Sequence, residues 1–198
     1  MATLTLANQL TLLRMLLIPA FVLLVVYARL GWALAVLAVA GITDALDGLI
    51  ARRAGQKTTL GAWLDPMADK LLLTSAFIVL TVPGTALLNR IPLWLTVLVL
   101  SRDIVIVVTV AIVNLAVGRR TFKPSIWGKI ATALYIVTAL VYMVCNYLEV
   151  SPPILEVCVY ASLGITILSS LHYISHAARV INGPEDPQHP DDASGPGS

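Results

Sequence analysis

Residues 32–82 read WALAVLAVAGITDALDGLIARRAGQKTTLGAWLDPMADKLLLTSAFIVLTV. Two apolar runs, 32–51 and 62–82, lie on either side of a short basic connection. Each run has the roughly 20 residues that a helix needs to cross the hydrocarbon core of a bilayer. The stretch therefore predicts two membrane-spanning helices joined by a short turn.

Four similar apolar runs surround this pair, at about residues 9–28, 92–117, 129–148 and 154–178. Only 12% of the chain is charged and 58% is hydrophobic, whereas a soluble domain carries about twice that charged fraction. No β-type alternation competes with the helical runs. The sequence predicts an all-α integral membrane protein, a bundle of six transmembrane helices. The expected breakers between the spans are Gly31, Pro83-Gly84, Pro92, Gly118 and Pro152-Pro153.

The two ends of the chain differ in character. The run Leu16 to Tyr27 is long enough for a signal peptide, but Arg14 is the only basic residue before it and more spans follow, so a retained first span is expected. Residues 182–198 are rich in Pro, Asp, Gly and Ser and have no apolar period. We expect one membrane domain over 1–181 and a disordered cytoplasmic tail over 182–198.

The basic residues of the connections predict the orientation. Lysine and arginine gather in the loops that face the cytoplasm, and only Arg29 and Arg90 fall on the opposite side here. Both termini are therefore expected in the cytoplasm, in an inner (plasma) membrane. The basic residues on the cytoplasmic side are Arg52, Arg53, Lys57, Arg119, Arg120, Lys123 and Arg179.

Other binding classes fit poorly. The net charge of +2 and the lack of a basic stripe argue against nucleic acid. Cys145 and Cys158 lie in apolar runs, where cysteine packs as a small hydrophobe, so neither a disulfide nor a zinc site is expected. His172 and His176 lie four residues apart, but no third ligand has suitable spacing, so a polar helix–helix contact is the better interpretation.

Four carboxylates inside predicted spans are the strongest functional signal. Each costs on the order of 2.5–3.5 kcal/mol on insertion scales. Asp44 and Asp47 share one helix face at i, i+3, and Asp65 and Asp69 share another at i, i+4. The short turn should bring both faces to one depth, where the charges repel unless cations lie between them. Oxygen ligands favour two Mg²⁺ or Mn²⁺ ions of the kind that activate phosphates.

The residues between the aspartates suit a large phosphate ligand. Gly48, Ala51 and Gly61 leave little bulk next to the acids, so a polyanion can approach the backbone. Arg52 supplies a planar cation that fits a pair of phosphate oxygens.

This pattern resembles the signature of the CDP-alcohol phosphotransferase family at every defined position. The matching residues are Asp44-x2-Asp47-Gly48-x2-Ala51-Arg52-x8-Gly61-x3-Asp65-x3-Asp69. The resemblance implies that Asp44, Asp47 and Asp65 hold two divalent ions, and that Asp69 is the base and lies close to one metal. It also implies CDP-diacylglycerol as donor, release of CMP, an active site at the cytoplasmic face and a homodimer.

Residues for donor and acceptor are expected elsewhere in the bundle. Asn8 and Thr11 lie with Arg14 on one face of the first span; they form either a wall of the nucleotide pocket or a helix entry with a snorkelling arginine. Arg102 either pairs with Asp103 or binds an anionic acceptor together with Lys123 and Lys129. Lys70, which follows Asp69, is expected to be a local counter-charge.

The acceptor is the open question at this level. The opening Asn8-Gln9-Leu10-Thr11-Leu12-Leu13-Arg14 and Gly128-Lys129-x2-Thr132 resemble the branch that uses glycerol 3-phosphate, the phosphatidylglycerophosphate synthases. Ala131 and Tyr135 depart from that branch. Ser101-Arg102-Asp103 and Lys123-Pro124-Ser125 resemble the cardiolipin synthases, which use phosphatidylglycerol. Both acceptors carry a phosphate, and glycerol 3-phosphate is favoured because its branch is the more widespread in bacteria.

Two functions of other classes fit the sequence less well. A divalent-cation transporter predicts carboxylates near the bilayer midplane on a continuous polar route, whereas these carboxylates gather at one end with Arg52 among them. A metal-binding scaffold gives no reason for glycine and alanine next to the acids. The enzyme is therefore the favoured interpretation.

Overall fold

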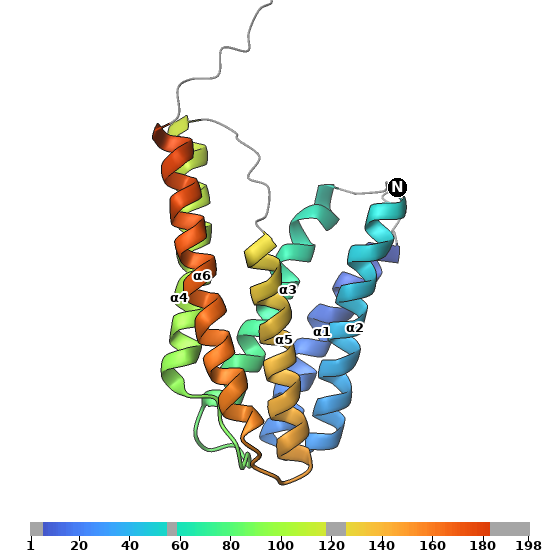
Figure 1. Ribbon diagram of the computed structural model, residues 1–198. Coiled ribbons are helices and arrows are strands. Elements are labelled where there is room, and N and C mark those ends of the chain that lie inside the picture. The colour runs from blue at the N-terminus through green and yellow to red at the C-terminus, as the bar shows by residue number, and fades with distance from the viewer. Residues whose placement is uncertain (1–5, 55–58, 118–125, 183–198) are drawn as a thin grey trace, which may run out of the picture.

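The computed structural model describes residues 6–54, 59–117 and 126–182, and the side chains of 13–43, 70–109, 126–173 and 175. Every described segment is helical apart from short connections (Figure 1). The helices are α1 (Leu6–Val26), α2 (Leu30–Ala54), α3 (Thr59–Thr81), α4 (Leu93–Val117), α5 (Ile126–Tyr147) and α6 (Ile154–Asn182). The six predicted spans are thus confirmed, each within a few residues of its predicted bounds. The predicted tail lies outside the described residues, apart from Asn182.

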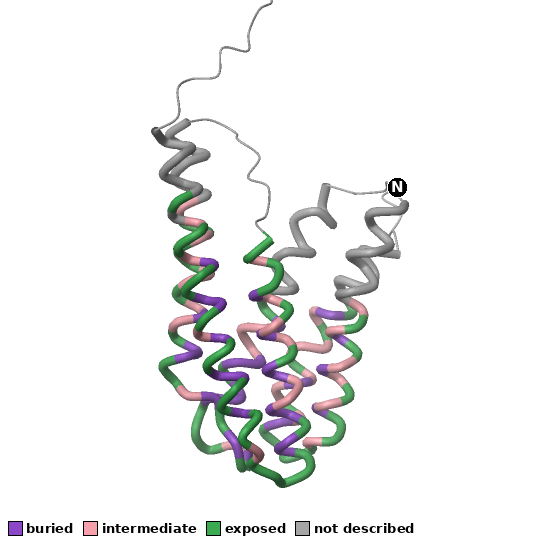
Figure 2. Tube along the Cα trace, in the orientation of Figure 1, coloured by how far each residue is buried: buried purple, intermediate pink, exposed green. Residues whose placement is uncertain are grey.

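The outer surface of the bundle is apolar, as a bilayer requires. Two described stretches, Ile126–Tyr147 and Ile154–Tyr173, are long and apolar enough to cross a membrane. Large hydrophobic side chains such as Leu16 of α1, Ile42 of α2 and Ile104 of α4 are exposed on other helices as well. Figure 2 shows exposed residues alternating with buried ones along the helices. The chain is therefore a six-helix integral membrane bundle.

The helices run up and down, and their packing defines two ends. α1 packs against α2 and α3, α5 packs against α2, α3 and α6, and α4 packs against α3 and α6. In Figure 1, α2 ends and α3 begins at the upper end, which we call the aspartate end. The connections α1–α2, α3–α4 and α5–α6 lie at the lower end, the far end. The last turns of α4 and α6 also lie at the aspartate end.

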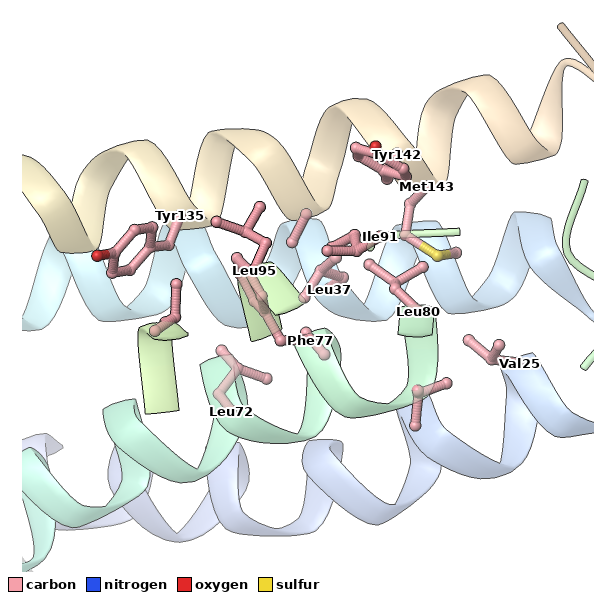
Figure 3. Close-up of a cluster of buried hydrophobic side chains, with 14 of the residues drawn as sticks. Val25, Leu37, Leu72, Phe77, Leu80, Ile91, Leu95, Tyr135, Tyr142 and Met143 are labelled. Atoms are coloured by element: carbon pink, nitrogen blue, oxygen red, sulfur yellow. The ribbon is translucent and has the colours of Figure 1, made fainter. Parts of the chain in front are cut away.

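A shared apolar core fills the space between α2, α3, α4 and α5. Figure 3 shows Leu37, Phe77, Leu80, Leu95 and Met143 gathered there. Each of these side chains is buried. Lipid tails are as apolar as these side chains, so tight packing, rather than exclusion of water, holds the helices together.

Buried hydroxyl pairs fix the register of neighbouring helices. Thr81 and Thr96 are hydrogen-bonded at 2.6 Å and join α3 to α4. Tyr135 and Thr166 are 2.6 Å apart and join α5 to α6, as do Thr138 and Ser162 at 3.0 Å. Polar groups find few other partners in hydrocarbon, so these pairs favour one helix alignment over its neighbours.

The Tyr135 pair yields a stability prediction. Tyr135→Phe removes one buried hydrogen bond but keeps the edge contact with Phe77, whose ring centroid lies 5.8 Å away. Thr166 stays satisfied because it donates to the carbonyl of Ser162. The loss should be about 1 kcal/mol, which lowers Tm in detergent by roughly 2–4 °C. Tyr160→Phe, at an exposed position on α6, is the matched control and should leave Tm unchanged.

At the far end, hydrogen bonds between Asn89 and Asn146 join the α3–α4 connection to α5. Asn146 of α5 accepts from the backbone N–H of Asn89 at 2.8 Å and donates to the Asn89 carbonyl at 2.9 Å. It also donates to the carbonyl of Tyr142. The Asn89 side chain in turn donates to the Val150 carbonyl and accepts from Ser151. The α3–α4 and α5–α6 connections are therefore held as one unit.

The first turn differs from expectation in one detail. Gly31 was expected to break the helix there, but it lies inside α2. The left-handed residue of the turn is Ala28, with φ of 57°. Gly31 serves packing instead, since a Cβ at this position would lie 3.0 Å from the Tyr147 ring of α5.

Candidate functional site

The four aspartates occupy matching levels on α2 and α3. Asp47 lies seven residues before the end of α2 and Asp65 six after the start of α3, so both are about 10 Å from the connection. Asp44 and Asp69 are each ten residues from those helix ends, or about 15 Å. Four residues separate the helices, so at most roughly 18 Å of chain joins their ends. The backbone thus supports the predicted equal depth of the two pairs.

Most of the predicted site side chains lie outside the described set. Among the side chains that the structure describes, no three His, Cys, Asp or Glu residues group as a metal site. The helical backbone positions are described, but not the side chains, for Asn8, Thr11, Asp44, Asp47, Gly48, Ala51, Arg52, Gly61, Asp65 and Asp69. Lys123 lies outside the described residues altogether. Their roles stay predictions.

A described ionic cluster lies next to the helical turn that carries Asp69. Arg102 Nη1 donates to Asp103 Oδ1 at 2.7 Å. The other oxygen of Asp103 lies 4.0 Å from the ammonium of Lys70, the residue after Asp69. The predicted Arg102–Asp103 pair is therefore present, and among the described side chains Lys70 is a counter-charge for Asp103 of α4. The cluster carries one net positive charge.

Ser169 completes this cluster from α6 and was missed in the sequence. Its hydroxyl accepts a hydrogen bond from Arg102 Nη2 at 2.5 Å. The available signal was a polar stripe: Ser162, Thr166, Ser169 and Tyr173 follow at steps of four, three and four residues, which places them on one helix face. Sequence reasoning found the cation but not the hydroxyl that holds it.

Arg14 is buried rather than exposed. Its residue surface is 1% accessible, on the part of α1 that packs against α2 and α3. A snorkelling arginine places its head in water, so that alternative is wrong for Arg14. A buried guanidinium has to be paired, and α1, which carries Arg14, packs against both aspartate-bearing helices.

The remaining candidates on α5 and α6 divide into core and surface. Lys129 is exposed in the first turn of α5, at the aspartate end. Ala131 and Tyr135 are buried core residues, so the departures from one branch of the resembling family are packing positions. The His172 side chain is exposed and makes no polar contact with another described helix, so the predicted helix–helix contact is not present for His172 among the described residues; its carbonyl accepts from Ser175 of the same helix. The side chain of His176 lies outside the described set.

A hollow among the described residues is remote from these groups. A cavity of about 310 Å³ opens at the far end, beside the α1–α2 turn and the end of α5. Arg29, Trp32, Tyr147 and Glu149 are among its lining residues. It lies at the end of the bundle opposite to the aspartates and takes no part in the candidate site.

Comparison with known proteins finds the same family that the aspartate pattern resembles. The model of the CDP-alcohol phosphatidyltransferase family matches residues 4–169. A probable phosphatidylglycerophosphate synthase of Mycobacterium tuberculosis is 37% identical over 90% of this chain and 84% of its own length. A CMP-forming cardiolipin synthase of Rattus norvegicus is 32% identical over 90% of this chain and 64% of its own length. A CMP-forming cardiolipin synthase of Streptomyces coelicolor is 37% identical over 65% of this chain and 60% of its own length.

The family match spans five helices completely and most of the sixth, including both aspartate-bearing segments and the Arg102–Asp103–Ser169 cluster. Relatives of 30% identity or more extend over nine-tenths of the chain. This chain therefore belongs to the CDP-alcohol phosphatidyltransferase family, whose members are membrane-embedded transferases of phospholipid synthesis.

Proposed function

We propose that this chain transfers the phosphatidyl group of CDP-diacylglycerol to glycerol 3-phosphate, forming phosphatidylglycerophosphate and CMP. The observation that carries the choice of acceptor is the 37% identity, over 90% of the chain, with a relative named probable phosphatidylglycerophosphate synthase. The net-positive cluster around Arg102 supports an acceptor that bears a phosphate. Cardiolipin synthesis, with phosphatidylglycerol as acceptor, is the second candidate because two further relatives carry that name.

The donor set of the site fits two Mg²⁺ or Mn²⁺ ions. It consists of carboxylates alone on consecutive helices at matching levels, and hard oxygen ligands suit these ions. Asp44, Asp47 and Asp65 would hold the ions, with Asp69 close to one of them. The ions would neutralise the diphosphate of the donor.

The chain's own residues then carry out the transfer. The Asp69 carboxylate takes the proton of the acceptor hydroxyl. The acceptor oxygen forms a bond to the lipid-side phosphorus as the bond from that phosphorus to the CMP oxygen breaks. Arg52 stabilises the charge on the departing CMP, while Gly48, Ala51 and Gly61 let the diphosphate approach the backbone. Asn8 and Thr11 border the cytidine, and Arg102, Lys123 and Lys129 hold the acceptor phosphate.

The setting of the reaction belongs to the same proposal. The basic connections favour an aspartate end that faces the cytoplasm, where a soluble acceptor meets a lipid donor. The exposed apolar faces of the bundle are compatible with a homodimer in the membrane. Residues 183–198 are proposed to be a disordered tail on the same side.

An acceptor assay tests the function. Purified protein in lipid nanodiscs receives CDP-diacylglycerol, Mg²⁺ or Mn²⁺ and one acceptor at a time, and CMP release and lipid products are followed by mass spectrometry. We expect turnover with glycerol 3-phosphate, none with phosphatidylglycerol, and complete loss on addition of EDTA that excess metal reverses. Turnover with phosphatidylglycerol alone would replace the proposed acceptor, and activity that survives EDTA would contradict the metal site.

A further inference from the structure

Two hydrogen-bond donors in the Arg102 cluster have no acceptor among the described residues. Arg102 Nε is buried and has no hydrogen-bond partner within the part of the chain that the structure describes. The guanidinium is firmly held, because its two terminal nitrogens bond to Asp103 and Ser169 and its side chain is only 9% exposed. A buried donor without a partner costs about 1–3 kcal/mol, so a held guanidinium with one unused N–H points to a missing acceptor.

Ser169 supplies the second unused donor. It is 1% exposed, and Arg102 is its one hydrogen-bond partner among the described residues. In that contact the arginine donates and the Ser169 oxygen accepts, which leaves the Ser169 O–H proton without an acceptor. Its neighbours on α6 behave differently: Thr166 donates to the carbonyl of Ser162, and Ser170 to the carbonyl of Thr166. Of these three described hydroxyls, only that of Ser169 does not donate to a backbone carbonyl of its own helix.

The surroundings make this pair of donors a rigid and positively charged position. On the side of Ser169 toward the far end, the Thr166 hydroxyl is hydrogen-bonded to Tyr135 of α5. On the side toward the aspartate end, the Tyr173 hydroxyl donates to the Ile106 carbonyl of α4 at 3.5 Å. Asp103, the one carboxylate in the cluster, is engaged by Arg102 on one side and approached by Lys70 on the other. The net charge of Lys70, Asp103 and Arg102 is therefore positive, which favours an anion.

We propose that Ser169 and Arg102 together form an oxyanion-binding site between α4 and α6, in which the Ser169 hydroxyl and Arg102 Nε donate to oxygens of the acceptor's phosphate. Ser169 is thus a further acceptor-binding residue. The proposal rests on the proposed function only for the identity of the ligand; the site itself requires any phosphate-type oxyanion. Phosphate contacts of this kind are charge-assisted and strong.

The kinetic test compares two adjacent serines in the nanodisc-embedded protein. Ser169→Ala should raise KM for glycerol 3-phosphate by roughly tenfold, with KM for CDP-diacylglycerol unchanged and kcat within about twofold. Ser170→Ala, the matched control, removes a hydroxyl that bonds only to its own helix and should leave both KM values unchanged. The proposal is overturned if Ser169→Ala leaves the acceptor KM unchanged, or if it raises the KM of donor and acceptor equally.

A binding measurement separates this site from the proposed reaction. Without donor, inorganic phosphate should raise Tm of the wild type and of Ser170→Ala, and should not raise Tm of Ser169→Ala. If the protein does not use glycerol 3-phosphate but phosphate protection still requires Ser169, the proposed acceptor is wrong and the site stands. If glycerol 3-phosphate is used but phosphate protects all three proteins alike, the proposed function stands and the Ser169 site is wrong.

Discussion

Replacing Asp69 by asparagine is expected to lower kcat by at least about 10³-fold. Asparagine has nearly the shape of aspartate but cannot take the proton of the acceptor hydroxyl, and a positioned base contributes typically 10²–10⁴-fold. The lost negative charge also weakens any hold on a nearby metal. The measurement is CMP release under saturating donor and acceptor, with donor binding followed separately by native mass spectrometry of the CDP-diacylglycerol complex.

Binding and catalysis should separate in this variant. Asp69→Asn is expected to retain the donor complex, because Asp44, Asp47 and Asp65, the proposed metal ligands, are unchanged. Glu149→Gln is a suitable control, since Glu149 is an exposed carboxylate at the far end of the bundle and its loss should leave kcat unchanged. Full activity in Asp69→Asn would show that another group is the base.

Replacing Asn146 by alanine is expected to lower the stability of the bundle by about 2–5 kcal/mol. The change removes three hydrogen bonds made by a side chain that is 1% exposed. It leaves the backbone N–H and carbonyl of Asn89 without these partners, and each such group costs about 1–3 kcal/mol. The expected result is a large fall in Tm, measured by tryptophan fluorescence or by retention of monodisperse protein after heating in detergent.

A smaller change in the same network provides the comparison. Ser151→Ala removes one hydrogen bond to the Asn89 side chain and leaves the backbone of Asn89 bonded to Asn146. Its effect on Tm should be a minor fraction of that of Asn146→Ala. Equal effects of the two variants would mean that the hydrogen bonds of Asn146 to the Asn89 backbone do not determine the stability of this end of the bundle.

Span positions were predictable from the sequence because each spanning helix has to fulfil a length requirement by itself. Runs of about 20 apolar residues located all six helices to within a few residues, including the short α2–α3 connection. The first turn was less predictable. Ala28, and not a glycine, adopts the left-handed conformation there, and Gly31 is needed for contact with Tyr147 of a helix over 100 residues away. That contact exists only in the assembled bundle.

The site divides in the same way. The aspartate pattern is local, so spacing alone grouped its members and predicted their equal depth. The Arg102 cluster joins three helices, and its members Lys70 of α3 and Ser169 of α6 cannot be found from spacing on α4. For Arg14 the sequence left two alternatives for a similar reason: whether a long cation reaches water or turns inward depends on the neighbouring helices.

The hydroxyls of α6 also bear on the order of assembly in the membrane. Thr166 and Ser170 satisfy their O–H groups on their own helix, so this segment can leave the translocation machinery and enter lipid before any partner helix is beside it. The cross-helix bonds of Ser169 and Ser162, in contrast, require α4 and α5 to lie beside α6. The Ser170 hydroxyl thus bonds only within α6, the hydroxyls of Ser162 and Ser169 bond to neighbouring helices, and the Thr166 hydroxyl does both, since it also pairs with Tyr135 of α5.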